Sequence, residues 1–254
     1  MANLKLRVVL DLEGRDVYWQ MAIDEAMLMA KLRGIAESTL RIYKFKPSAV
    51  TVGYFQKIEE AVNLGFLNEM GIQYTRRITG GGSVFHDSDG EITYSIVLPA
   101  TGDLANVQES YRIICNGIVY ALRKLGVRAE FVPVNDVVVH GRKISGSAQA
   151  RRGGYLLQHG TLMYATNLDV LEKVLVAPVE KLRNKGVKSI KERVVTLKQL
   201  TGAVNVDELV KGLIEGFAIS IGAEPVPGEL TGAELKLAEE LVSKYRSREW
   251  IFKR

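Results

Sequence analysis

One short run of this sequence constrains all the others: Arg76-Arg77-Ile78-Thr79-Gly80-Gly81-Gly82-Ser83-Val84-Phe85-His86-Asp87. Its three glycines have no Cβ, so the backbone can take positive φ and its N–H groups can come close to a ligand. Arg76 and Arg77 precede the turn, and a guanidinium presents a planar fork of donors that suits phosphate or carboxylate oxygens. The run therefore predicts a loop that holds an anion. A glycine-rich hairpin turn with solvated arginines is the alternative.

The glycine run differs from the two common nucleotide-binding loops. No Gly-Lys-Ser/Thr follows it, as in a P-loop, and its spacing is not the GxGxxG of a dinucleotide fold. A second run of small residues lies further along the chain, Gly141-Arg142-Lys143-Ile144-Ser145-Gly146-Ser147-Ala148. A compact ammonium held there suits a developing charge on a carboxylate–phosphate centre. The alternative for Lys143 is an edge-strand lysine that limits aggregation.

The amino-acid composition limits which classes of protein this chain can belong to. The chain has 254 residues, of which 47% are hydrophobic, enough for one large core or one core with a small appendage. It has no apolar run of about 18 residues and no signal-peptide pattern, which predicts that it does not enter a membrane. One cysteine, Cys115, fits a reducing cytoplasm, and three histidines give no metal-ligand cluster. The net charge of +5 is mild and forms no dense basic stripe with aromatics, so we expect no nucleic-acid binding.

The hydrophobic periodicity predicts a mixture of helices and strands. The clearest amphipathic helix spans residues 107–125, where Cys115 is expected to be a small core residue. Further helices are predicted at residues 16–32, 63–70, 168–175, 206–220 and 231–245. Strands are predicted at residues 4–12, 40–43, 49–52, 72–76, 91–98, 128–132, 136–140, 143–147 and 154–164. Residues 181–195 read as a loop or lid, and Glu25 as a solvated helix residue. Because no regular βαβ alternation appears, the pattern favours an α+β fold.

Four motifs together resemble those of the lipoate–protein ligase family. The glycine run matches Arg-Arg-x-x-Gly-Gly-Gly-x-Val-x-His-Asp at every fixed position. Asn135-Asp136 and the run around Lys143 match Asn-Asp, a few apolar residues, then Gly-x-Lys-(Ile/Val)-Ser-Gly-Ser-Ala. His159-Gly160-Thr161-Leu162 matches a third motif, and residues 185–194 match Lys-Gly-x-x-Ser-(Ile/Val)-x-x-Arg-Val. The resemblance runs from about residue 16 to residue 254.

The resemblance implies a fold and a reaction. The fold is the α+β catalytic domain of biotin and lipoate ligases and class II aminoacyl-tRNA synthetases, a mixed, largely antiparallel sheet flanked by helices. The implied enzyme is an ATP-dependent lipoate–protein ligase with ATP and Mg²⁺ as substrate and counter-ion, lipoate as second substrate, and no prosthetic group. It would form lipoyl-AMP and pass the lipoyl group to a lysine of a lipoyl domain, on 2-oxoacid dehydrogenase E2 subunits or the glycine cleavage H protein.

The resemblance also assigns roles to residues. Lys143 is expected to act in both chemical steps. ATP or the adenylate is expected to contact Arg77, Gly82, Ser83, Val84, Phe85, Asp136 and Lys143. Lipoate is expected to contact Gly80, Gly81, His86, Lys143, Ser145 and His159. Residues 185–196 are expected to cover the activated intermediate, and metal ligands are not identified.

Two other functions remain open. An octanoyl or lipoyl transferase of the same superfamily would hold the acyl group on a cysteine. In one branch that cysteine lies in the loop corresponding to residues 131–135, and in another it follows the lysine motif. Cys115 is at neither place, so a transferase would lack its nucleophile and the ligase is the preferred interpretation. The other candidate is a non-catalytic binding protein for lipoate or lipoyl domains.

The resemblance further predicts one catalytic domain over residues 1–254 without the C-terminal accessory domain that many relatives carry. We therefore expect a separate small accessory subunit, docking near Trp250 and Phe252, since aromatic side chains are common interface anchors.

Overall fold

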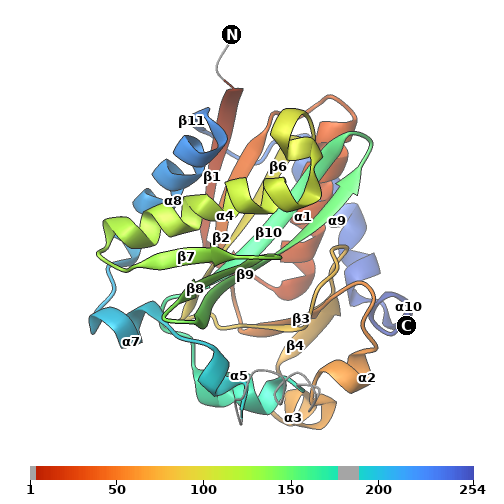
Figure 1. Ribbon diagram of the computed structural model, residues 1–254. Coiled ribbons are helices and arrows are strands. Elements are labelled where there is room, and N and C mark those ends of the chain that lie inside the picture. The colour runs from red at the N-terminus through yellow and green to blue at the C-terminus, as the bar shows by residue number, and fades with distance from the viewer. Residues whose placement is uncertain (1–3, 177–188) are drawn as a thin grey trace.

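The computed structural model describes residues 4–176 and 189–254. Eight strands form the main sheet in the order β11-β1-β2-β6-β10-β9-β8-β7, and three form a second sheet in the order β4-β3-β5 (Figure 1). β1 pairs in parallel with β11 and β2, and the other pairs of the main sheet are antiparallel. The strands are β1 (Leu4–Arg15), β2 (Thr39–Phe45), β3 (Ala49–Val52), β4 (Gln73–Arg76), β5 (Val84–His86), β6 (Glu91–Pro99), β7 (Ala129–Val132), β8 (Asp136–Val139), β9 (Arg142–Arg152), β10 (Tyr155–Met163) and β11 (Ala223–Pro227).

Helices cover both faces of the main sheet. One face carries α4 (Val107–Lys124) and α8 (Val206–Ile221), and the other carries α1 (Val17–Leu32) and α9 (Gly232–Arg246) (Figure 1). α4 and α8 approach closely because two glycines face each other: a Cβ on Gly216 would lie 2.2 Å from the carbonyl oxygen of Gly117. The shorter helices are α2 (Ile58–Ala61), α3 (Leu64–Glu69), α5 (Leu168–Val174), α7 (Leu197–Thr201) and α10 (Arg248–Ile251), with 3₁₀ turns at Gly102–Ala105 and Lys191–Arg193.

The small sheet has its own apolar core, formed with α2, α3 and α5. Arg76, which is fully buried, fastens this sheet to α10. Its guanidinium donates to the carbonyl oxygens of Trp250 and Ile251 and to those of Gly53, Tyr54 and Gln56, at 2.7–3.1 Å. An arginine has five N–H donors, so one side chain can satisfy carbonyls from several segments at once. Arg76 thus connects the start of the glycine run to residues 250–251 by hydrogen bonds.

The α+β class and the largely antiparallel sheet are confirmed. The expectation for Glu25 is wrong: its side chain is buried between α1 and α9, where its carboxylate accepts hydrogen bonds from Lys244 Nζ and Tyr245 Oη at 2.6 Å each. The helical period placed Glu25 on α1 but could not show that α9 covers that side. The predicted loop or lid over residues 181–195 and the predicted cover over residues 185–196 both lie partly outside the described residues. None of the described helices is long and apolar enough to cross a membrane.

Candidate active site

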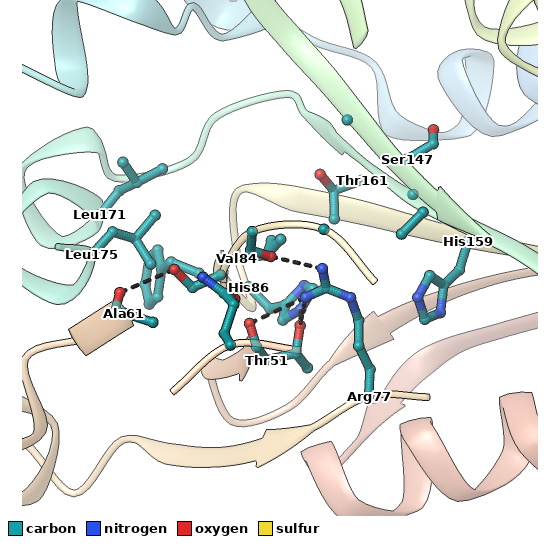
Figure 2. A pocket seen from close by; sticks show the side chains of 18 of the residues that line it. Thr51, Ala61, Arg77, Val84, His86, Ser147, His159, Thr161, Leu171 and Leu175 are labelled. Carbon is teal, nitrogen blue, oxygen red and sulfur yellow. Dashed lines mark hydrogen bonds between the residues drawn. The ribbon is translucent and has the colours of Figure 1, made fainter. Parts of the chain in front are cut away.

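A cavity of about 610 Å³ lies between the main sheet and the small sheet. Its walls come from β3, the turn after β4, β5, β9, β10 and the segment that follows α5. Figure 2 shows Arg77 beside Thr51 and His159, with Leu171 and Leu175 on another side of the same space. Nine predicted site residues line it: Arg77, Gly81, Gly82, Ser83, Val84, Phe85, His86, Lys143 and His159. The fold therefore brings the glycine run, the lysine run and the His-Gly-Thr-Leu strand together.

Lys143 is held at the edge of this cavity by an irregularity in the sheet. The β8–β9 register shifts between Val137 and Val138, so the strand bulges beside Lys143. Bulges of this kind redirect a side chain. The ammonium forms an ion pair with Asp136 Oδ1 at 2.6 Å, and the lysine side chain remains 39% exposed. A Cβ on Gly146 would lie 2.3 Å from Lys143 Nζ, so the glycine provides the space in which the ammonium lies.

The guanidinium of Arg77 bonds to the chain itself. Its Nη2 donates to the carbonyl oxygens of Gly80 and Gly82 at 2.6 and 2.7 Å, and its Nε donates to Thr79 Oγ1 at 3.0 Å. Its Nη1 lies 3.3 Å from both oxygens of Thr51. Burial lowers the pKa of Arg77 to about 10. Arg77 therefore holds the shape of the glycine turn through the turn's carbonyls. The predicted contact with phosphate stays a prediction.

Two histidines extend from Arg77 in hydrogen-bonded chains. His159 lies 2.6 Å from Thr79 Oγ1 through Nε2 and 2.8 Å from Asp24 Oδ2 through Nδ1. Burial lowers the pKa of His159, although Asp24 opposes that shift. A neutral ring that donates from Nδ1 to Asp24 and accepts from Thr79 satisfies both contacts. His159 is thus fixed in position as part of the cavity wall.

The other histidine pairs with a buried acid that sequence reasoning missed. His86 Nδ1 lies 2.7 Å from Glu91 Oε1, His86 Nε2 lies 2.9 Å from Thr51 Oγ1, and Phe45 stacks on the ring. Burial lowers the pKa of His86 well below its usual range and raises that of Glu91 well above its usual range. Both effects favour neutral groups. Glu91 Oε2 is buried without a hydrogen-bond partner.

Three predicted residues do not line the cavity. Asp136 forms an ion pair with Lys143, and the carbonyl oxygen of Gly80 accepts a hydrogen bond from Arg77. Ser145 is buried. Asp24, Glu91 and Gly53 were missed. The signal for Asp24 was an acid within an apolar helix, whereas nothing local marks Glu91 or Gly53. Among the described residues, no group of three histidine, cysteine, aspartate or glutamate side chains is placed to hold a metal ion.

Cys115 packs on the α4 side of the main sheet, in the core shared with α8. It is 0% exposed, and burial raises the pKa of its thiol to about 11. The sulfur contacts Ser147 Oγ at 3.5 Å and Gln158 Nε2 at 3.6 Å. Since Ser147 itself lines the cavity, one residue separates the thiol from that space. The expectation that Cys115 packs in the core is confirmed.

A lysine on the main sheet and a glycine turn on the small sheet face one cavity, and this arrangement defines a catalytic domain of the ligase and transferase class. The chain belongs to the lipoyl protein ligase A/B catalytic domain family, whose model matches residues 16–218. It is 37% identical to the octanoyltransferase LipM of Kyrpidia tusciae, over 93% of this chain and 94% of that protein. It is 32% identical to LipM of Staphylococcus aureus, over 94% and 96%.

Solved structures confirm the fold. A structure described as a bipartite lipoate protein ligase and its E2 lipoyl domain from Thermoplasma acidophilum matches with a TM-score of 0.85 at 33% identity, covering 99% of this chain and 97% of that one. A lipoate–protein ligase A bound with ATP matches with a TM-score of 0.84 at 30% identity, covering 98% of each chain.

The expectation of an ATP-dependent ligase is wrong. Eight curated relatives, 29–37% identical over 92–97% of this chain, are octanoyltransferases. The physical reason for the error lies in the motifs. Both reactions deliver a medium-chain acyl group to a lysine amine, so both need an apolar cavity and a cation at the acyl carbonyl. The four motifs describe that shared part of the site and do not separate the two kinds of acyl donor.

Proposed function

We propose that this chain is an octanoyltransferase that moves an octanoyl group from an activated donor, such as a thioester, to the ε-amine of a lysine on a lipoyl domain. The observation that carries the proposal is the relationship to octanoyltransferases along nearly the whole chain. The cavity supports it, because its apolar wall includes Val84, Phe85, Met163, Leu171 and Leu175. An octanoyl chain is apolar along its length, and burying it there is favourable.

Lys143 is placed for the chemistry of acyl transfer. When an amine attacks a thioester, negative charge develops on the carbonyl oxygen, and a fixed cation or hydrogen-bond donor stabilises that charge. The Lys143 ammonium is such a group, and Asp136 holds it at the edge of the cavity. The acyl tail then lies inward along the apolar wall, with its carbonyl at Lys143.

The acceptor is proposed to be a lipoyl domain of a 2-oxoacid dehydrogenase E2 subunit or the glycine cleavage H protein. The structural relative from Thermoplasma acidophilum, described together with an E2 lipoyl domain, supports this class of acceptor. The separate accessory subunit stays a prediction. Trp250, one of its expected anchors, donates from Nε1 to the carbonyl oxygen of Arg76 at 2.7 Å and packs near Tyr54 and Tyr245. Phe252 is half-buried.

The test is intact-mass analysis of a purified lipoyl domain after incubation with the enzyme and an octanoyl thioester of a pantetheine carrier. We expect a gain of one octanoyl group without added nucleotide, and no gain on a domain whose acceptor lysine is replaced by arginine. A parallel reaction contains free octanoate or lipoate with ATP and Mg²⁺. The binding of ATP and Mg²⁺ to this chain also stays a prediction. Acylation in the parallel reaction alone would overturn the proposed function.

A further inference from the structure

A row of paired residues crosses the main sheet beside the cavity. Gly146 of β9 pairs with Thr161 of β10, and Thr161 pairs with Thr93 of β6. Thr93 in turn pairs with Tyr43 of β2, and all of these residues line the cavity. Residues directly opposite each other on neighbouring antiparallel strands place their side chains on the same face of the sheet. The row is therefore one continuous side of the cavity.

The two ends of this row differ. At the β9 end, a Cβ on Gly146 would lie 2.3 Å from Lys143 Nζ, so the ammonium lies directly over the first residue of the row. At the β2 end, the row stops at the large side chain of Tyr43, which is 0% exposed. Its hydroxyl donates to Asp24 Oδ2 at 3.0 Å, and the guanidinium carbon of Arg41 lies 4.0 Å from the centre of its ring. Tyr43 is thus held by a hydrogen bond and by a cation over its ring.

A group of buried side chains continues the β2 end of the cavity. Thr93 Oγ1 donates to Glu91 Oε1 at 2.9 Å, and His86 Nδ1 lies 2.7 Å from the same oxygen. Phe45 joins His86 to Tyr43, because its ring centre lies 3.9 Å from that of the imidazole and 5.6 Å from that of the phenol. Hydrogen bonds and ring contacts therefore fix the three cavity-lining residues Tyr43, His86 and Glu91, which we call the end wall.

The length of the row matches that of an octanoyl group. Paired strands lie about 4.8 Å apart, so two spacings place Thr93 about 9.6 Å from Gly146, and Tyr43 stands one spacing further on. A saturated chain advances about 1.25 Å per carbon–carbon bond, given bonds of about 1.52 Å and angles near 111°. The seven bonds from the carbonyl carbon to the terminal methyl of an octanoyl group then span about 9 Å. The methyl of an octanoyl group whose carbonyl lies at Lys143 would therefore reach Thr93.

Building on the octanoyltransferase function, we infer that the end wall sets the length of the acyl group that this enzyme transfers. The octanoyl tail crosses β10 at Thr161 and ends over Thr93, in front of Tyr43 (Figure 2). A decanoyl tail is about 2.5 Å longer and meets the end wall, whose packed and hydrogen-bonded side chains do not move aside without cost. A hexanoyl tail leaves the space over Thr93 unfilled and loses the burial of two methylenes. Eight carbons is thus the length that fills the row, and Tyr43 is a specificity-determining residue.

The test is a chain-length profile measured with the intact enzyme and a purified lipoyl domain. Hexanoyl, octanoyl, decanoyl and dodecanoyl thioesters of a pantetheine carrier serve as donors, and kcat/KM is compared among them. We expect kcat/KM to rise roughly tenfold from hexanoyl to octanoyl, the effect of two buried methylenes, and to fall at least roughly tenfold from octanoyl to decanoyl. A wild-type profile that stays level from octanoyl to dodecanoyl would overturn the inference.

Tyr43→Val tests the end wall directly. It opens the far end of the row, so the ratio of kcat/KM for decanoyl to that for octanoyl should rise at least about tenfold in protein whose melting curve shows a folded state. Tyr43→Phe is the matched control, because it removes the hydrogen bond to Asp24 but keeps the ring, and its ratio should stay at the wild-type value. A folded Tyr43→Val enzyme with the wild-type ratio would contradict the inference. The same rise in Tyr43→Phe would also contradict it, because the ring would then not limit the tail.

Thr93→Leu should change the profile in the opposite direction, and its result does not depend on the folding of Tyr43→Val. A longer side chain fills the end of the row, so this variant should prefer hexanoyl to octanoyl, and an unchanged preference in folded protein would contradict the inference. Leu175 belongs to the apolar wall and not to the row, so Leu175→Ala can slow transfer but should leave the ratio of decanoyl to octanoyl unchanged. If Leu175→Ala admits decanoyl and Tyr43→Val does not, the tail ends beside Leu175 and the inference fails. Absence of transfer by the wild type with every donor is a separate result, and it contradicts the proposed function instead.

Discussion

Lys143 is the residue on which the proposed chemistry depends most. Lys143→Ala should lower the rate of acyl transfer by at least about 10²-fold, the usual loss when a donor to a developing oxyanion is removed. The melting temperature should change little, because partly exposed ion pairs contribute at most about 1 kcal/mol and the lysine side chain is 39% exposed. Lys143→Arg should also be slow, since a planar fork does not replace a point charge in the space beside Gly146.

The measurement is single-turnover transfer to a lipoyl domain, paired with a thermal melt of each variant. The control is Lys124→Ala, which removes an exposed lysine at the end of α4 whose partner is Glu215, away from the residues that line the cavity. A Lys143→Ala enzyme that transfers at the wild-type rate would show that the ammonium does not act on the acyl carbonyl.

Glu91 gives the site a predictable response to pH. Burial raises its pKa well above the usual range, so the folded protein keeps this carboxyl protonated at pH values where the unfolded chain has released the proton. The free energy of unfolding must then fall as pH rises above the ordinary carboxyl pKa near 4.5. The pKa of His86 is lowered, and its contribution is opposite: it reduces stability as pH falls below about 6.5.

Glu91→Gln should therefore gain stability relative to the wild type as pH rises from about 5 to 8, because a neutral amide removes the cost of burying an acid. Chemical denaturation of both proteins across that range measures the difference. Glu91→Ala is the control, and it should be less stable than Glu91→Gln because His86 Nδ1 loses its partner. A difference between Glu91→Gln and the wild type that does not change with pH would show that Glu91 is ionised in the folded state.

At the scale of elements, the glycine turn depends on a second glycine far from it in sequence. A Cβ on Gly53, at the end of β3, would lie 2.0 Å from the carbonyl oxygen of Gly81. Gly53→Ala should displace the turn, cost about 2–4 kcal/mol of stability and reduce transfer. Gly232→Ala is the matched control, because a Cβ at the start of α9 meets nothing within 4 Å. Denaturant unfolding of the two variants is the measurement, and equal stability would contradict the close approach.

The elements that the sequence predicted best are the long periodic ones. α4 was predicted as residues 107–125 and spans Val107–Lys124, because its apolar residues recur at helical spacing against α8 and the sheet. β11 was not predicted: it is short, mostly exposed and contains two prolines, so no hydrophobic alternation marks it. β5 is only three residues long and follows the glycines directly. Short strands of this kind are fixed by their partners.

The candidate site was predicted only in part, because some of its geometry depends on packing between distant strands and not on local sequence. The motif residues were located because they match the motifs of the lipoate–protein ligase family. The β8–β9 bulge that redirects Lys143 and the carbonyl contacts of Arg77 depend on the packed sheet. Asp24 and Glu91 are buried acids whose partners, His159 and His86, lie on other strands.

At the scale of the whole molecule, one buried ion pair joins β1 to α9. Arg7 donates to both carboxylate oxygens of Glu234, at 2.9 and 2.5 Å, and the two side chains are 9% and 1% exposed. Glu234 also completes the capping box at the start of α9 with Thr231. Glu234→Ala should cost roughly 3–5 kcal/mol, since it leaves a buried guanidinium without its carboxylate.

Such a loss should lower the melting temperature by about 2–4 °C per kcal/mol for a chain of this size. Glu240→Ala, on the exposed side of the same helix, is the control and should melt within about 1 °C of the wild type. Differential scanning calorimetry compares them. A Glu234→Ala protein as stable as that control would mean that water reaches Arg7 in the folded chain.

The hydrogen bonds of Arg76 to residues 250 and 251 have a consequence for folding during synthesis. Its guanidinium lies at the start of the glycine turn, yet two of the carbonyls that it binds belong to Trp250 and Ile251. Both sheets are translated before those two residues leave the ribosome. A nascent chain that has completed every strand still carries a buried arginine without two of its acceptors. We therefore expect the glycine turn to reach its final form only after residues 250 and 251 have left the ribosome, because only then can Arg76 donate to their carbonyl oxygens.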